Sequence, residues 1–241
     1  MQGRNASPFC IGIMGGMGPL AGVELQRRII ERTPATCDQD HFEVLVHTNP
    51  RIPDRTQSLR ENGGDAYVRA LRPTIAFLEL HGADVLAMPC CTAHARFDEL
   101  QASTSVPIID MVGAAVAEAV RRAGPSPRIG LLTTDGARAV ELFPKRAPDP
   151  NIAWILPDVD GQRTIMEVIY ATKRRSCTDG QALVPVVDAL RRAGAAMLLL
   201  GCTELSLHAS AWERMGYPVV DPLDVLAHQL VTLGMAARSA G

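Results

Sequence analysis

The chain has 241 residues, of which 47% are hydrophobic and 4% aromatic, so aliphatic side chains must form most of its core. Its 24 Lys and Arg residues and 26 Asp and Glu residues leave a net charge of −2, which gives no electrostatic attraction to nucleic acid or to an anionic membrane surface. No stretch approaches the roughly 18 consecutive apolar residues that a membrane-spanning helix needs.

The N-terminal segment MQGRNASPFCIGIMGGMG contains an apolar stretch that is too short and too interrupted by glycine for a signal peptide. We therefore expect the chain to remain in the cytoplasm, where cysteines stay reduced. A catalytic or packing role is then expected for each cysteine rather than a disulfide. Cys10, Cys37 and Cys177 are interpreted as packing or incidental residues. The other three are Cys90, Cys91 and Cys202.

Short aliphatic runs alternate with helical patterns along the chain. The runs, in chain order, are CIGIMG, FEVLVHTN, DVLAMPC, VPIIDM, RIGLLTT, AMLLLGC and YPVVDP, and segments such as AGVELQRRIIERT and PVVDALRRAGA lie between them. Strands that are apolar on both faces, each followed by a helix, are typical of a parallel sheet covered by helices on both sides. The sequence therefore predicts an α/β fold.

The aliphatic runs also form two similar series. Three matches in the same order predict two pseudo-symmetric lobes, each a mainly parallel sheet flanked by helices, at residues 1–112 plus 222–241 and at residues 113–221. The alternative is that strand–loop–helix units resemble one another without a repeat. The matched pairs are Gly12 with Gly130, Cys90 with Cys202 and Asp110 with Asp221, at offsets of 118, 112 and 111 positions.

Cys90 and Cys202 each end an aliphatic run, so they are expected to occupy equivalent positions in the two lobes. Ligands of open α/β sheets bind beyond the carboxyl ends of the strands. We therefore expect one thiol on each side of a ligand, in a cleft between the lobes. Cys91 pairs with Thr203 in the repeat and is interpreted as part of the wall of that site.

Two opposed thiols suit the inversion of a stereocentre that carries an acidic C–H bond. One thiolate removes the proton from one face, and the other thiol returns a proton to the opposite face. The ordinary pKa of cysteine, about 8.5, makes both forms accessible near neutral pH. Thr92 and Thr203 are predicted helix N-caps, and the backbone N–H groups of such helix starts would lower a thiol pKa and hold a carboxylate.

Five segments of the chain resemble the cofactor-independent aspartate/glutamate racemase superfamily, and especially its aspartate racemase branch. The segments are GIMGGMGPLA (12–21), NPRIPDRT (49–56), MPCCTAHA (88–95), GCTEL (201–205) and DPLDVLA (221–227). The resemblance implies two α/β lobes, an active site between them, a homodimer, no cofactor, and Cys90 and Cys202 as the catalytic pair. The family usually has Asn after the first catalytic cysteine; Cys91 stands there and leaves the preferred substrate open.

The substrate that the resemblance implies is a small acidic amino acid. Arg55 matches a family arginine that meets the distal carboxylate, which suits its planar fork, although a surface Asp54–Arg55 charge pair is the alternative. A basic residue follows Tyr170, either Lys173 or Arg174, and a solvated charge run is the alternative there. The remaining candidates for substrate contact are Gly15, Met17, Asn49, Cys91, Thr92, Thr133, Thr203 and Glu204, the last expected in the first turn of a helix.

Other cofactor and metal sites have weaker support. GMGPLA, from Gly16, fits a glycine-rich dinucleotide pattern, but the next strand ends in VHTNP without an acidic residue. Cys90, Cys91 and His94 lack a second nearby ligand set for zinc, so no metal is expected and His94 is expected to bond to backbone. The sequence thus predicts cofactor-independent racemisation of aspartate or glutamate. A maleate cis–trans isomerase-like enzyme and a non-catalytic binder of acidic amino acids remain alternatives.

Overall fold

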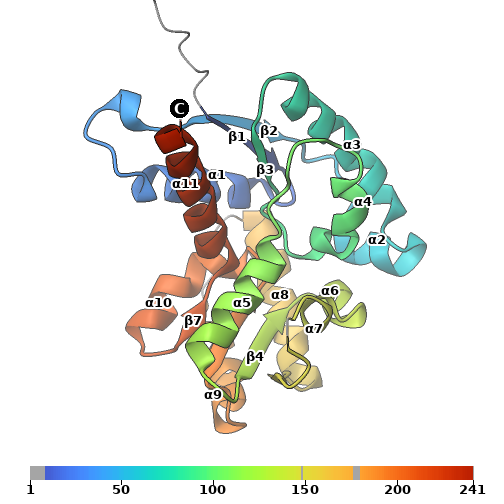
Figure 1. The fold of residues 1–241 in the computed structure, drawn as a ribbon. Coiled ribbons are helices and arrows are strands. Elements are labelled where there is room, and N and C mark those ends of the chain that lie inside the picture. The colour runs from blue at the N-terminus through green and yellow to red at the C-terminus, as the bar shows by residue number, and fades with distance from the viewer. Residues whose placement is uncertain (1–8, 148, 176–179, 241) are drawn as a thin grey trace, which may run out of the picture.

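The computed structural model describes residues 9–147, 149–175 and 180–240, so Cys177 lies outside the described residues. The chain forms two parallel sheets flanked by helices (Figure 1), which confirms the predicted α/β class. The strands are β1 (Cys10–Gly15), β2 (Glu43–Thr48), β3 (Val85–Ala87), β4 (Arg128–Thr133), β5 (Ala153–Ile155), β6 (Met197–Gly201) and β7 (Val219–Val220).

The helices follow the strands in the alternation that the sequence predicts. The α-helices are α1 (Pro19–Arg32), α2 (Arg55–Asn62), α3 (Asp65–Leu80), α4 (Phe97–Gln101), α5 (Met111–Ala123), α6 (Asp135–Ala139), α7 (Leu142–Lys145), α8 (Val159–Arg175), α9 (Val184–Arg192), α10 (Ala209–Arg214) and α11 (Pro222–Ala240). Short 3-10 helices are η1 (Asp38–Asp40), η2 (Thr92–Arg96), η3 (Gly180–Leu183) and η4 (Leu205–His208). None of the helices in the described ranges has the length and hydrophobicity of a membrane-spanning segment.

The two sheets share one topology. Their strand orders are β2-β1-β3 and β5-β4-β6-β7, with every pair parallel, so β1 and β4 lie at equivalent inner positions. An isolated bridge between Leu86 and Ile108 extends the first sheet where β7 extends the second. Because all strands of a sheet run the same way, their carboxyl ends meet at one edge, where ligands of such sheets bind.

The repeat extends to individual packing contacts. A Cβ atom on Gly12 would lie 2.7 Å from the Leu86 side chain, and one on Gly130 would lie 2.9 Å from the Leu198 side chain. Both glycines therefore allow a close approach that a larger residue would block. Leu86 and Leu198 are 112 positions apart, the same offset that separates the two candidate catalytic cysteines.

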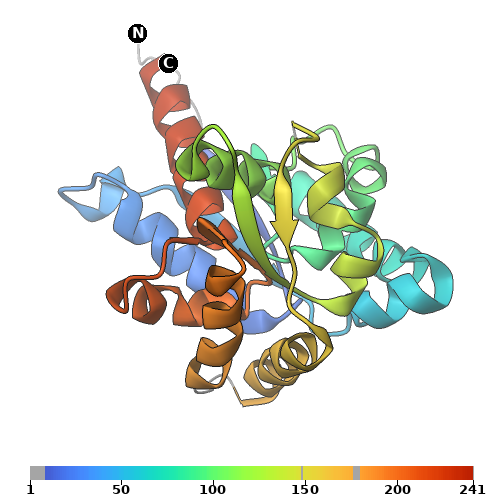
Figure 2. The same ribbon diagram turned by 90° about the horizontal axis from the view of Figure 1, so that it is seen from below.

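Helices α5 and α11 cross between the two halves of the chain. α5 follows the last bridge of the first sheet but packs against β4, β6 and β7, whereas α11 follows β7 but packs against α1 (Figures 1 and 2). On this packing we propose the lobes as residues 1–112 plus 222–241 and residues 113–221. One buried cluster includes apolar side chains of β1, β4, α5 and α11, so the lobes share a continuous core.

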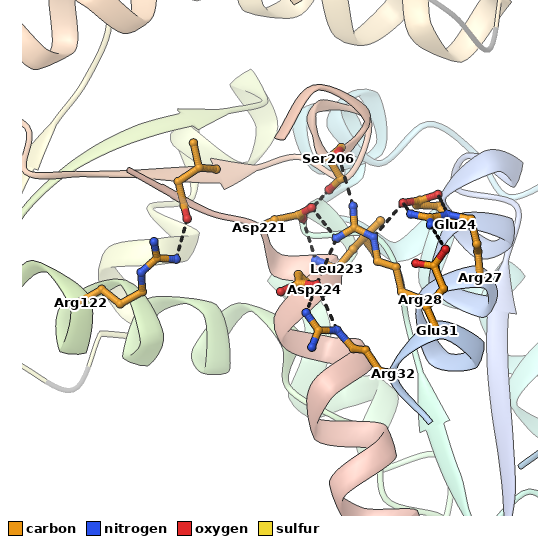
Figure 3. A network of polar contacts seen from close by, with 11 residues as sticks. Glu24, Arg27, Arg28, Glu31, Arg32, Arg122, Ser206, Asp221, Leu223 and Asp224 are labelled. Atoms are coloured by element: carbon orange, nitrogen blue, oxygen red, sulfur yellow. Dashed lines mark hydrogen bonds and ion pairs between the residues drawn. The ribbon is translucent and has the colours of Figure 1, made fainter. Parts of the chain in front are cut away.

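A buried polar network joins α1 to the second half of the chain (Figure 3). Arg28 of α1 donates through Nη1 to Asp221 Oδ2 at 2.6 Å, and the Ser206 hydroxyl donates to Asp221 Oδ1 at 2.6 Å. The N–H of Leu223 donates to the same Oδ1 at 3.0 Å, at the start of α11. Ser206 lies four residues after Cys202, so the network connects α1 to the turn that follows this cysteine.

Candidate active site

Cys90 and Cys202 line the same small pocket between the two halves of the chain. Cys90 lies three residues beyond β3 and Cys202 directly follows β6, so each thiol is at the carboxyl end of a parallel strand. The side chains are 5% and 4% exposed, and both cysteines are free thiols. The pocket is lined by Asp54, Arg55, Thr56, Cys90, Cys91, Thr92, Thr134, Ile169, Tyr170, Lys173, Cys202, Thr203 and Glu204.

The pocket is narrow. Its cavity volume is about 10 Å³, which is room for roughly one water molecule. An adjoining space of about 90 Å³ is lined by Gly18 and the start of α1, and Lys173, Thr203 and Glu204 line both spaces. An amino acid therefore requires these side chains to move apart before it fits between the thiols.

Two hydrogen bonds join the halves next to the cysteines. The Thr203 hydroxyl donates to the Pro89 carbonyl at 3.3 Å, and the hydroxyls of Thr92 and Thr134 lie 2.9 Å apart. Neither Thr92 nor Thr203 caps a helix with its side chain, so the prediction that they are N-caps is wrong. The short 3-10 helices η2 and η4 follow the cysteines, and the threonine hydroxyls bond across the pocket instead.

Thr133, a predicted substrate contact, is absent from the pocket lining. Its hydroxyl donates to the Gly201 carbonyl at 2.9 Å, so it joins β4 to β6. The next residue, Thr134, lines the pocket and caps α6 by accepting a hydrogen bond from the N–H of Ala137 at 3.2 Å. A threonine immediately before the DGARA helix is a recognisable N-cap pattern, and it would have pointed to Thr134.

Arg55 is the first residue of α2 and is 6% exposed. Its Nη2 donates to the Met17 carbonyl at 2.7 Å, and its Nη1 donates to the carbonyls of Pro53 at 3.1 Å and Ile52 at 3.3 Å. These bonds fix the guanidinium in a single position within the pocket wall. They also occupy N–H groups that would otherwise bind a substrate carboxylate.

The charge of Arg55 is maintained by its neighbours. Burial opposes its charged form, but the anionic forms of Cys90, Asp54 and Glu204 outweigh that cost and raise the pKa of Arg55. Cys90 is the strongest of these three influences. A fixed cation therefore lies beside one of the two thiols.

The other thiol lies beside a carboxylate. Cys202 Sγ donates to Glu204 Oε2 at 3.0 Å, and Lys173 Nζ lies 3.7 Å from Glu204 Oε1. Burial, followed by the charge of Glu204, raises the pKa of Cys202 well above its ordinary value. Burial opposes the charge of Lys173, but Glu204 and then Cys202 outweigh it and raise the pKa of Lys173.

Helix α8 presents one face to the pocket. Ile169, Tyr170 and Lys173 line it, whereas Arg174 is exposed, so the structure brings the lysine and not the arginine to the thiols. The Tyr170 hydroxyl donates to Asp54 Oδ1 at 3.4 Å, which connects α8 to the start of α2. Lys173 shares a helix face with Ile169 and Tyr170 because it follows them by four and three positions.

Cys91 is 1% exposed and lines the pocket beside Cys90. Burial, followed by the charge of Cys90, raises the pKa of the Cys91 thiol well above its ordinary value. Its side chain also belongs to the core cluster that runs between the lobes. Cys91 is therefore placed as a neutral part of the pocket wall.

Gly15, Met17 and Asn49, three predicted substrate contacts, do not line the pocket. Met17 contributes its carbonyl to Arg55, and the N–H of Asn49 donates to the Gly15 carbonyl at 3.1 Å. The Asn49 side chain accepts a hydrogen bond from the N–H of Arg51 at 3.1 Å. These residues shape the loop beside the pocket. The lining residues that the sequence did not single out are Asp54, Thr56, Thr134 and Ile169.

His94 bonds to backbone at both ring nitrogens, as the sequence predicts. Nδ1 donates to the Cys90 carbonyl at 2.9 Å, and Nε2 accepts from the N–H of Met111 at 3.3 Å. Burial lowers the pKa of His94, so the ring is neutral. Among residues 9–147, 149–175 and 180–240, no group of three or more His, Cys, Asp or Glu side chains is arranged to hold a metal ion.

Comparison with known proteins shows that the chain is similar to amino-acid racemases. The family model described as Asp/Glu/Hydantoin racemase matches residues 14–230. The broad specificity amino-acid racemase RacX of Bacillus subtilis (strain 168) is 24% identical over 234 residues, which cover 95% of this chain and 100% of that protein.

Solved structures have the same fold. The aspartate racemase of Picrophilus torridus superposes with a TM-score of 0.81 and 28% identity, covering 94% of each chain. The glutamate racemase of Francisella tularensis subsp. tularensis SCHU S4, solved with D-glutamate, has a TM-score of 0.69 and 15% identity over 95% of this chain and 82% of that one. The latter similarity concerns the fold alone.

Proposed function

The chain belongs to the Asp/Glu/hydantoin racemase family and is an isomerase, and we propose that it racemises aspartate or glutamate without a cofactor, using Cys90 and Cys202. The observation that carries this proposal is that two thiols from equivalent strand ends line one pocket. An acidic amino acid bound between them presents one face of its α-carbon to each sulfur.

The proposed reaction transfers two protons. One cysteine thiolate takes the α-proton, which leaves a carbanion stabilised by the adjacent carboxylate, and the other thiol donates its proton to the opposite face. The roles exchange in the reverse direction. Because both sulfurs are nearly excluded from water, the proton that is returned comes from the second thiol, and so the product is inverted.

The charged residues of the pocket favour an acidic substrate. Lys173 reaches the pocket from α8 and is held by Glu204 at 3.7 Å, a separation at which a substrate carboxylate would compete for the ammonium group. Thr92 and Thr203, which lie next to the cysteines, supply hydroxyls that bind the α-carboxylate or α-amine. The aspartate racemase of Picrophilus torridus, with 28% identity, supports aspartate as the first substrate to test.

The direct test is exchange of the α-proton in heavy water. The protein incubated with L-aspartate or L-glutamate is expected to incorporate deuterium at the α-carbon and to form the D enantiomer, both followed by NMR and chiral chromatography. Replacement of Cys90 or Cys202 by Ser is expected to reduce turnover by about 10²–10⁴-fold, the contribution typical of general acid–base groups. Absence of exchange with any amino acid rejects racemisation, and full activity of both variants rejects the two-thiol mechanism. Maleate in the same panel tests cis–trans isomerisation.

We also propose that the working form is a homodimer in the cytoplasm. β2 is an edge strand of the first sheet, and apolar side chains that are at least one third exposed lie on it and on the helices to either side. These form the β2 surface, which consists of Val23, Ile30, Val46, Phe77 and Leu80. A second copy that pairs along β2 would cover them. The cytoplasm keeps thiols reduced, as the two-thiol mechanism requires.

A further inference from the structure

The two thiols of the pocket have unlike neighbours. Cys202 Sγ lies 3.0 Å from Glu204 Oε2, and an ionised carboxylate only accepts hydrogen bonds, so the proton in this contact belongs to sulfur. Glu204 is 7% exposed, and its other oxygen forms an ion pair with Lys173 Nζ at 3.7 Å. The contact therefore stabilises Cys202 as a thiol.

Cys90 has the opposite surroundings. Arg55 is held by the carbonyls of Met17, Pro53 and Ile52, so its guanidinium cannot turn away from the pocket without breaking three hydrogen bonds. Cys90 is the strongest of the neighbouring charges that interact with this guanidinium. The structure thus provides a carboxylate for one cysteine and a guanidinium for the other.

We propose that Glu204 is a further catalytic residue, which holds Cys202 as the proton donor of the resting enzyme and leaves Cys90 as the proton acceptor. The proposal rests on the racemase function proposed above and assigns a starting protonation state to it. The Cys90 thiolate takes the α-proton: the C–H bond breaks, an S–H bond forms, and the electron pair stays on carbon. Cys202 then gives its proton to the opposite face and becomes a thiolate, while Glu204 remains a carboxylate.

Several charged or titratable groups face Cys202, and among the described residues Glu204 is the one that hydrogen-bonds to its sulfur. Lys173 acts in the opposite sense, because it stabilises a thiolate. Removal of the Glu204 charge would leave Lys173 unopposed, so Cys202 would ionise more readily. The groups that line the pocket around Cys202 are Glu204 on its own turn, Tyr170 and Lys173 on α8, Cys90 and Cys91 after β3, and Asp54 and Arg55 at the start of α2.

The rate of alkylation by iodoacetamide at pH 8 measures the thiolate fraction of each cysteine, with the modified peptide identified by mass spectrometry. In the C90S background, E204Q is expected to raise the alkylation rate of Cys202 at least about tenfold, since one pKa unit changes the thiolate fraction tenfold. E204D keeps the charge and is expected to stay slow. Equal rates in C90S and C90S/E204Q would overturn the proposal.

Matched variants distinguish the effect of the Glu204 charge on Cys202 from an effect of easier access of the reagent to the pocket. In the C202S background, Cys90 is expected to react faster than Cys202 does in C90S. E204Q is expected to raise the Cys90 rate less than it raises the Cys202 rate, because Glu204 hydrogen-bonds to Cys202 and acts on Cys90 through Lys173. A parallel rise at both cysteines would mean easier access and would also overturn the proposal. D54N removes a carboxylate that lines the pocket without contacting Cys202, and it is expected to have no effect on Cys202.

Alkylation requires no substrate. If the wild-type protein shows no deuterium exchange but Cys202 responds to E204Q, the proposed function fails and the assignment of Glu204 as the partner of Cys202 stands. If exchange occurs but Cys202 does not respond, the racemase function stands and the role of Glu204 is rejected.

Discussion

Buried thiols make the stability of this protein decrease as the pH rises in the alkaline range. Burial raises the pKa values of Cys91 and Cys202 well above the ordinary range of a cysteine thiol, about 8.5 to 9. The folded chain therefore keeps protons that the unfolded chain loses above pH 9, so stability is complete below pH 9 and falls as the pH rises toward the folded pKa.

Replacing Cys91 with Ala is expected to reduce this alkaline loss. Between pH 8 and pH 10 the free energy of unfolding, measured with urea, should fall by about 1.4 kcal/mol less in C91A than in the wild type, because one thiol no longer ionises preferentially in the unfolded chain. Cys37 is exposed, and C37A should retain the full loss. An identical pH dependence in C91A would contradict the assignment of Cys91 as a buried neutral thiol.

Among the secondary-structure elements, α1, α11 and the turn after Cys202 hold the lobes in their arrangement. Arg28, Asp221 and Ser206 form a buried network between them (Figure 3). Burial raises the pKa of Asp221, whereas Arg28, Ser206 and the N–H of Leu223 favour its charged form. Removal of one partner would leave the other charge buried without compensation.

We expect R28M to lower the free energy of unfolding by about 3–5 kcal/mol, the cost typical of breaking a buried ion pair. The double variant R28M/D221N should recover most of that loss. The amide that D221N introduces is neutral, and its oxygen can still accept from Ser206 and Leu223. Urea denaturation of the single and double variants gives the coupling energy. Additive losses would show that Arg28 and Asp221 do not depend on each other.

At the scale of the whole molecule, the proposed homodimer depends on the β2 surface as its interface. Phe77 and Leu80 of α3 are 41% and 82% exposed. The Phe77 ring contacts the His47 ring of β2, with 4.8 Å between the ring centroids. F77S/L80S is expected to convert the homodimer to a folded monomer in analytical ultracentrifugation. V159S changes an equally exposed residue of α8 and should leave the mass unchanged. A wild-type monomer, or a dimer that survives F77S/L80S, would contradict this interface.

The α/β class, the internal repeat and the position of Cys90 and Cys202 at strand ends are all predictable from the amino-acid sequence. These features are local, because a strand buried on both faces must be an uninterrupted aliphatic run. The residue at the end of such a run can therefore be identified from the sequence alone. The offset of 112 positions then relates the two cysteines without any knowledge of the fold. His94 is likewise predictable as a histidine bonded to backbone.

The neighbours of these thiols, in contrast, are fixed by tertiary contacts. The choice between Lys173 and Arg174 depends on how α8 is rotated against the pocket. Thr133 is a predicted substrate contact, but β4 ends at Thr133 and the next residue, Thr134, lines the pocket. The carbonyls that hold Arg55 come from separate loops, and Glu204 lies between Cys202 and a lysine from another helix. Contacts between distant segments leave no periodic pattern in the sequence, so the chemistry of each thiol is set only when the two halves of the chain meet.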